Sequence, residues 1–245
     1  MDNSLYFRER AYALKPLFAE LMQSVAGYTD YDLRPLFCIQ WGRSYPTDEN
    51  TGIMFYGRAT NGWITTETDV DKLFDPAFDD RIFARDDQMQ WVYDCAGTDN
   101  QYNSNRSAFW RIIRQVARGF YPSGEELLHV CWSNVCKIAP DGANPDNYLY
   151  YDQLPACQRI MQKEIEIFSP KHVVLLTGKG WAHDFLFFLN DSKEYLPIAS
   201  YTWGSRYCVK VYKIGEVFFY LTEHPQGKDE STHAAALIRA ISDNM

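Results

Sequence analysis

The chain has 245 residues, of which 46% are hydrophobic and 16% aromatic, and its formal net charge is −8. This composition is typical of a globular protein and excludes a disordered or collagen-like chain. No apolar run approaches the roughly 20 residues of a membrane span, and the first residues do not resemble a signal peptide, so we expect a cytoplasmic protein without membrane contact.

The N-terminal half is predicted to contain a helix, a strand and a long acidic insertion. Residues 4–26 form a helical pattern that Pro16 disturbs, and the apolar run 52–57 ends at a glycine, as a buried strand does. An insertion at about 64–100 follows, with a short helix near 79–92. Its acidic residues outnumber its basic ones ten to three, which favours a solvated loop.

The C-terminal half alternates helices and strands. Helices are predicted at 107–118, 152–168, 180–190 and 231–242, strands at 127–135 and 171–177, and a hairpin at 207–214 and 216–221. Asp152 and Ser231 are the expected N-caps, and Pro155 fits the first turn of its helix. The alternation predicts a three-layer α/β/α sandwich with a mainly parallel central sheet of about four strands, built as one domain over residues 1–245.

The candidate site follows from this sheet, because ligands bind at the carboxyl ends of parallel strands. The first strand ends in Gly57-Arg58-Ala59-Thr60-Asn61. Free backbone N–H groups and polar side chains there could hold a phosphate, a base or a water. A plain strand-to-loop turn explains this segment equally well.

The other strand ends offer an amide and an imidazole. Asn134 ends the second strand with one acceptor and two donors on a rigid group, which suits the edge of a pyrimidine; bonding to loop backbone is the alternative. After the third strand, residues 177–179 lack P-loop spacing and indicate a packing turn. After the fourth comes His224, fixed by Pro225, whose imidazole can donate to a developing oxyanion; a structural histidine is the alternative.

The basic residues lie behind the acidic insertion. Arg106, Arg111, Arg114 and Arg118 occupy a stretch without acids (100–124), so the negative total does not exclude a polyanionic ligand. The six cysteines form no Cys-x-x-Cys pair, and no other metal-ligand pattern occurs. We therefore expect free thiols, no metal and no cofactor.

In this order, the strand ends resemble those of the uracil-DNA glycosylase superfamily. Residues 134–140 (Asn-Val-Cys-Lys-Ile-Ala-Pro) resemble the Asn-Val-x-Lys-x-x-Pro stretch of its thermostable iron–sulfur branch. His224-Pro225 resembles the start of the family's His-Pro loop. Tyr102 precedes the Phe109-Trp110 pair where the mismatch-specific branch keeps a base-stacking aromatic. The resemblance spans roughly residues 52–242.

The resemblance implies a role for each segment in hydrolysing the N-glycosidic bond of an extruded nucleotide. The first loop would hold the catalytic water or stabilise the sugar cation. Tyr102 would stack on the base, Asn134 would read its edge, and His224 would stabilise charge on the departing base. The remaining predicted contacts are Pro225 and Lys228 to the ligand, and Arg106, Arg111 and Arg114 to phosphates.

The first loop departs from the family pattern. Arg58 and Ala59 stand where the family has its Glu and its Asp or Asn, so Asn61 would have to position the water. The cysteines of the iron–sulfur branch are also missing. Two hypotheses remain. The first is a DNA glycosylase that removes a deaminated or modified base from single- or double-stranded DNA in base excision repair. The second is an inactive protein of the same fold that binds a base, a nucleotide or nucleic acid.

Overall fold

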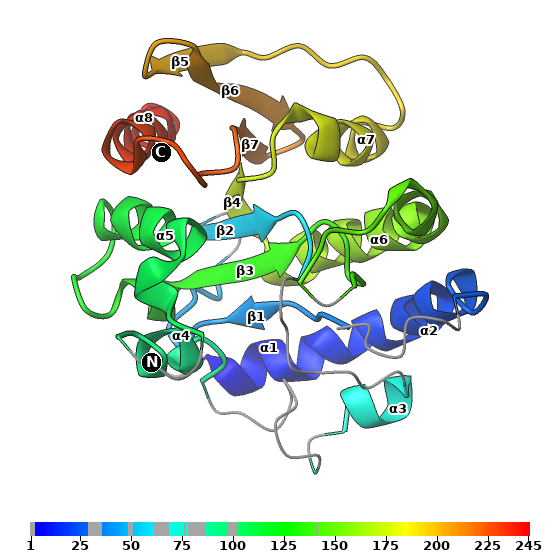
Figure 1. Cartoon of the computed structure of the whole chain (residues 1–245). Coiled ribbons are helices and arrows are strands. Elements are labelled where there is room, and N and C mark those ends of the chain that lie inside the picture. Colours follow the sequence, from blue (N-terminus) through cyan, green and yellow to red (C-terminus); the bar gives the residue numbers. More distant parts are fainter. Residues whose placement is uncertain are drawn as a thin grey trace.

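A seven-stranded mixed sheet lies between two layers of helices (Figure 1). The structure is a computed structural model that describes residues 3–28, 36–48, 51–60, 69–75, 77, 87–97, 102–140 and 142–245. The predicted α/β/α sandwich with a parallel core is confirmed, although the sheet has more strands than the expected four or so.

The sheet has the order β1-β3-β2-β4-β7-β6-β5. Its strands are β1 (Gln40–Trp41), β2 (Gly52–Gly57), β3 (Val130–Asn134), β4 (Pro170–Leu175), β5 (Ala199–Trp203), β6 (Tyr207–Ile214) and β7 (Val217–Leu221). Strands β3, β2, β4 and β7 are parallel, and β1, β6 and β5 extend the sheet in antiparallel fashion at its two sides. The four parallel strands therefore end on one common edge.

The helices differ in length and include several short turns. They are α1 (Ser4–Ala11), α2 (Lys15–Ser24), α3 (Val70–Leu73), α4 (Gln90–Asp94), α5 (Ala108–Arg118), α6 (Asn147–Phe168), α7 (Lys179–Leu189) and α8 (Glu230–Ser242), with 3₁₀ turns η1 (Tyr12–Leu14), η3 (Ser104–Arg106) and η4 (Glu126–His129).

The core has two halves because successive strand residues point to opposite faces of the sheet. Met54 and Tyr56 of β2 pack into the cluster formed with α1, α2, α6 and α7. Ile53 and Phe55 pack into the cluster formed with α5 and α8. Figure 1 shows these two helical layers on either side of the sheet. All six residues of β2 are buried, as expected for a central parallel strand.

Several predicted element boundaries were wrong. Helix α6 begins at Asn147, where the Asp146 side chain accepts a hydrogen bond from the Leu149 backbone N–H at 2.9 Å, so Asp152 lies inside the helix and is not its cap. Pro155 accordingly lies in the helix interior. Asp146 and Asp152 are both residues that can cap a helix, and they stand six positions apart in the sequence. Pro155 would lie in the first turn of a helix capped by Asp152, which is why the sequence favoured Asp152.

The other differences concern the two ends of the chain. The helix predicted at 4–26 is interrupted by η1 just before Pro16. Helix α8 is capped by Asp229, whose side chain accepts from the Ser231 N–H at 3.0 Å, so Ser231 is not the cap. Of the helix expected near 79–92, residues 79–86 lie outside the described residues, and α4 begins near its end.

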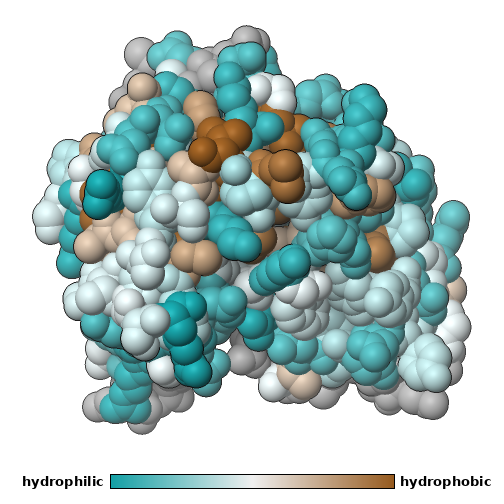
Figure 2. Space-filling view, turned by 90° about the horizontal axis from the view of Figure 1, so that it is seen from above, coloured by the Kyte–Doolittle hydropathy of each residue, from teal (hydrophilic) through white to brown (hydrophobic). Residues whose placement is uncertain are grey.

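The surface seen from the β5 side is mainly hydrophilic, with a small group of apolar side chains near its centre (Figure 2). None of the helices in the described ranges is long and apolar enough to cross a membrane. All six cysteines are free thiols, and four of them are buried.

Candidate functional site

A cleft of about 600 Å³ lies at the carboxyl ends of the parallel strands. The loops after β2, β3 and β7 and the first turn of α5 line it, whereas the loop after β4 does not. Of the predicted site residues, the cleft brings together Gly57, Arg58, Ala59, Tyr102, Arg106, Arg111, Asn134 and His224. Thr60, Arg114, Pro225 and Lys228 do not line it, and Asn61 lies outside the described residues.

Asn134 ends β3 opposite Gly57, the last residue of β2. Its side chain is 2% exposed, and its Nδ2 atom has no hydrogen-bond partner among the described residues. An unpaired buried donor is costly, so its retention is typical of a group that serves a ligand.

A fully buried ion pair fixes the backbone beneath this amide. Lys137 Nζ donates to Ser133 Oγ at 2.6 Å, to the Asn134 carbonyl at 2.7 Å and to Glu164 Oε1 at 2.8 Å. The Tyr56 hydroxyl donates to Glu164 Oε2 at 2.8 Å. Both charged side chains have no exposed surface. The network therefore ties the last residues of β2 and β3 to helix α6, directly behind the cleft.

His224 faces the cleft from the loop after β7. Its Nδ1 accepts a 3.3 Å hydrogen bond from the backbone N–H of Gln226, which assigns the proton of the neutral ring to Nε2. Burial, followed by the charges of Arg58 and Lys228, lowers the pKa of His224 to about 4. The ring is thus neutral at pH 7 and is a hydrogen-bond donor through Nε2.

Two aromatic residues that sequence reasoning left in the core also line the cleft. Phe109 lies in the first turn of α5, and its ring stands 6.4 Å from that of His224 at an interplanar angle of 14°. Trp132 of β3 lies 6.2 Å from Phe109. Helical spacing correctly placed most of α5 against the sheet, but the first turn of the helix also lines the cleft at the strand ends. That position is the signal that could have identified Phe109.

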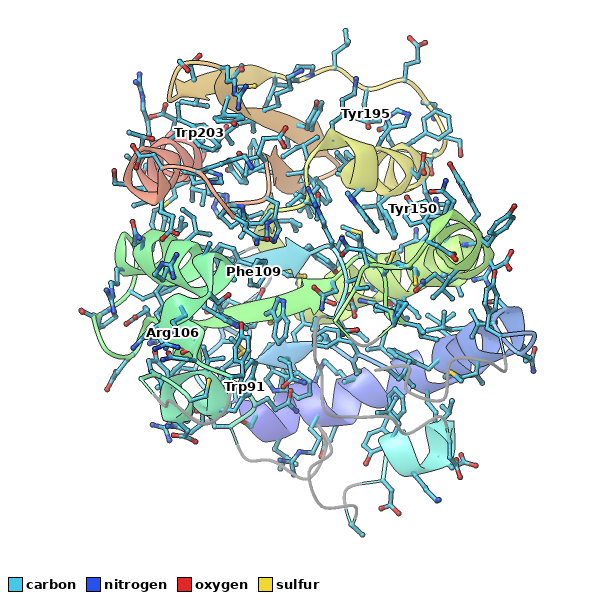
Figure 3. The ribbon with its side chains drawn as sticks, viewed as in Figure 1. Trp91, Arg106, Phe109, Tyr150, Tyr195 and Trp203 are labelled. Carbon is cyan, nitrogen blue, oxygen red and sulfur yellow. The ribbon has the colours of Figure 1, made fainter. Side chains whose placement is uncertain are left out.

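The predicted stacking residue, Tyr102, lies further out. Its side chain is 49% exposed, and its ring is 6.1 Å from that of Trp91. In Figure 3, Phe109 stands at the end of α5 nearest the sheet, with Arg106 and Trp91 below it. Phe109 therefore presents a flat surface beside Asn134 and His224, whereas Tyr102 is a half-exposed part of the cleft wall.

The side chain of Arg58 is turned toward the end of β4, where its Nε donates to the Thr177 carbonyl at 2.7 Å. Burial lowers the pKa of this guanidinium, and the charge of Glu223 partly offsets that effect. Among the described residues that line the cleft there is no aspartate or glutamate. The missing carboxylate of the first loop is thus not replaced from another described element.

The predicted phosphate contacts lie in different surroundings. Arg106 is exposed and lines the cleft. Arg111 also lines it but makes a two-point ion pair with Glu230. Arg114 donates to the Val92 carbonyl at 2.9 Å and to Ser104 Oγ at 3.1 Å, outside the cleft lining. The first turn of α5, capped by the Ser107 hydroxyl, adds the positive end of a helix dipole to this wall.

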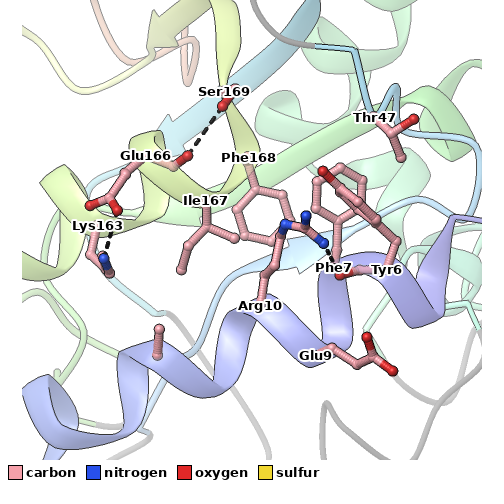
Figure 4. Close-up of a pocket in the computed structure, with 11 residues that line it drawn as sticks. Tyr6, Phe7, Glu9, Arg10, Thr47, Lys163, Glu166, Ile167, Phe168 and Ser169 are labelled. Carbon is pink, nitrogen blue, oxygen red and sulfur yellow. Dashed lines mark hydrogen bonds and ion pairs between the residues drawn. The ribbon is translucent and has the colours of Figure 1, made fainter.

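A second hollow of about 420 Å³ lies near the opposite ends of the strands, between α1 and the end of α6 (Figure 4). Three of its charged side chains interact with neighbours, since Lys163 pairs with Glu166 and Arg10 lies over the Tyr6 ring. In the part of the chain that the structure describes, no group of three His, Cys, Asp or Glu residues could hold a metal ion.

A comparison with models of protein families identifies the family of this chain. The sequence model of the uracil DNA glycosylase superfamily matches residues 28–233, which is most of the chain. A search of curated proteins found no match. The matched range contains all seven strands and every residue that lines the cleft.

Proposed function

Because the chain belongs to the uracil DNA glycosylase superfamily, we propose that it hydrolyses the N-glycosidic bond of a deaminated or modified base in DNA, as a base excision repair enzyme. The observation that carries this proposal is the convergence of Asn134, His224 and Phe109 on one cleft at the strand ends. A buried amide, a neutral imidazole and a flat ring are the groups that recognise an extruded base.

Asn134 would read the edge of the base. Its Nδ2 has no partner among the described residues and suits a carbonyl oxygen of a heterocycle, while Oδ1 can accept from a ring N–H. The Lys137–Glu164 pair holds the backbone of Asn134 in place, so little ordering cost remains when the base binds. The Phe109 ring would stack on the face of the base.

His224 would assist departure of the base. As the bond between C1′ and the base nitrogen breaks, its electron pair goes to the base. The Nε2–H of a neutral imidazole can donate to the base oxygen on which this charge collects. The oxygen of a water molecule then bonds to C1′, one of its protons stays on the new hydroxyl, and the other passes to the base or to solvent.

Water activation is the weak part of this site. No carboxylate lines the described part of the cleft, so leaving-group stabilisation by His224 would contribute most of the rate. Asn61 stays the proposed group for positioning the water.

DNA would approach along the wall formed by α5. The exposed Arg106 and the N-terminal end of α5 offer positive charge beside the cleft, which suits a backbone phosphate next to the extruded nucleotide. Arg111 is bound to Glu230, and Arg114 is bound to the Val92 carbonyl. These two arginines would stabilise the wall and not contact a phosphate.

Base release from oligonucleotides tests the proposal. The purified full chain is incubated with single- and double-stranded DNA carrying uracil, hypoxanthine or xanthine, and abasic sites are cleaved with alkali. Release should fall roughly 100-fold in His224→Gln, because one oxyanion donor is lost. It should also fall in Asn134→Ala. His183→Gln, a histidine on α7 bonded to Tyr195, is the matched control and should retain activity.

The outcomes separate the two hypotheses. Release that depends on His224 and Asn134 supports the glycosylase. Saturable binding of these DNAs without release would instead identify a nucleic-acid-binding protein of the same fold, which the absence of a carboxylate in the described cleft lining would explain. Neither release nor binding would contradict both.

A further inference from the structure

Arg58 contacts the loops that follow the two strands on either side of β2. Its backbone carbonyl accepts a 2.9 Å hydrogen bond from the Cys136 N–H, in the loop after β3. Its Nε donates at 2.7 Å to the Thr177 carbonyl, at the end of β4. One residue therefore joins three of the four strand ends, through its main chain on one side and its guanidinium on the other.

The guanidinium also faces the fourth strand end, across Gly178. A Cβ atom built on Gly178 would lie 3.6 Å from Arg58 Nη2 and 3.3 Å from Glu223 Oε2, so both groups border the space that this glycine leaves. Gly178 has a φ of +81°, and its N–H donates to the Thr222 carbonyl at 2.9 Å. The charge of Glu223 therefore acts on Arg58 from the residue next to His224.

The charged groups around His224 come from three elements. Arg58, in the loop after β2, acts on it through its charge, and both residues line the cleft. Lys228, in the loop of His224 itself, donates to the His224 carbonyl at 2.8 Å. His233 of α8 interacts with it electrostatically, and Glu223 precedes it in the chain. The ring stacked nearest to it, Phe109 of α5, carries no charge.

We propose that Arg58 is a positioning residue that joins the strand-end loops and whose charge adds to the effect of burial in disfavouring the protonated form of His224, which favours donation of a hydrogen bond to the departing base over transfer of a proton. This inference rests on the proposed function. It also gives a reason for an arginine where a carboxylate is expected. The cation is held by the Thr177 carbonyl and faces Glu223, and its charge acts on His224.

Two substitutions separate the charge of Arg58 from its hydrogen bond. Arg58→Gln removes the charge and keeps a donor for the Thr177 carbonyl, whereas Arg58→Lys keeps the charge and loses the planar Nε donor. Lys179→Met is the matched control, because Lys179 is an exposed cation at the start of α7 that is not among the charges acting on His224.

The measurement is NMR titration of the imidazole signals of the full chain from pH 8 down to pH 4. The His224 signal is assigned by its loss in His224→Gln. In the unchanged protein, in Arg58→Lys and in Lys179→Met, His224 should stay unprotonated down to pH 5. In Arg58→Gln its pKa should rise by roughly one unit, because one nearby like charge is removed. Circular dichroism shows whether each variant is folded, and Arg58→Met replaces Arg58→Gln should the latter not fold.

An unchanged His224 titration in both uncharged variants would overturn the inference, whatever the activity. A raised pKa in a chain that releases no base from DNA would leave the inference standing and contradict the proposed function alone. Where the chain is active, the acid limb of its pH profile should move upward with the pKa in Arg58→Gln and stay in place in Arg58→Lys.

Discussion

The Oδ1 atom of Asn134 lies so close to Gly57 that a Cβ atom on Gly57 would be only 2.4 Å from it. These residues end adjacent parallel strands and stand opposite each other in register. The same Cβ would also lie 3.3 Å from the ring of Phe109. Position 57 thus has room for glycine alone while the amide and the ring keep their places.

Gly57→Ala should damage the cleft. The added methyl group has to displace Asn134 or Phe109, and overpacking of this kind costs about 1–3 kcal/mol of unfolding free energy. We expect a lower urea midpoint and a loss of base release or DNA binding. Gly180→Ala is the control, because nothing lies within 4 Å of its Cβ position, and alanine in helix α7 should be neutral or stabilising. Equal behaviour of the two variants would contradict this account of position 57.

The buried pair of Lys137 and Glu164 predicts a strong coupling. Lys137→Met alone leaves a buried carboxylate without its cation and should cost about 3–5 kcal/mol. The double variant Lys137→Met with Glu164→Leu removes both charges and should recover a large part of that loss. Urea unfolding of the two single variants and the double variant measures the coupling. Additive losses would show that the two charges do not stabilise each other.

Arg106 and Arg111 should respond differently to substitution. Arg106→Ala removes an exposed charge beside the cleft, so DNA affinity should fall and the salt dependence of log K should decrease by about one unit. Arg111→Ala breaks the pair with Glu230 and should cost about 0.5 kcal/mol of stability. Fluorescence anisotropy at several salt concentrations, together with thermal unfolding, distinguishes the two. A larger salt effect from Arg111 would place the phosphate contact there instead.

Stability should fall between pH 7 and pH 5. Burial lowers the pKa of both His172 and His233 from 6.5 to about 4. Between these values the unfolded chain binds more protons than the folded one, so the unfolding free energy decreases as the pH falls. Each histidine contributes up to about 1.4 kcal/mol per pH unit. Urea titrations at pH 5, 6 and 7 measure the slope, which His172→Gln should reduce. An unchanged slope would mean that His172 titrates alike in both states.

The parallel core of the fold could be predicted from the sequence because its strands are continuous apolar runs. Residues 52–57 are the clearest case, since every one of them is buried. Strand β1 has only two residues, which is too short for any period to show. In β5 only Trp203 is buried, so the strand has no continuous apolar run. Strand β1 owes its place to pairing with the distant β3, and β5 owes its place to the hairpin that it forms with β6.

The convergence of the candidate site residues on one cleft could be predicted in part. Asn134 and His224 follow predicted strands, and the parallel topology is enough to bring them to one edge. The direction of a long side chain could not be predicted, because it depends on groups that are far away in the sequence. Arg58 bonds to Thr177, and Arg111 bonds to Glu230. No local pattern contains either partner, so the sequence could not tell which cations remain available to a ligand.

The tight turn at Gly215, between β6 and β7, is a suitable site for inserting a tag. Strand β7 runs parallel to β4 and ends at the cleft, so the turn where it begins lies at the far end of the sheet. Gly215 has a φ of +58°, and nothing lies within 4 Å of its Cβ position. An affinity tag or fluorescent reporter inserted there would project away from the cleft and leave bound DNA undisturbed.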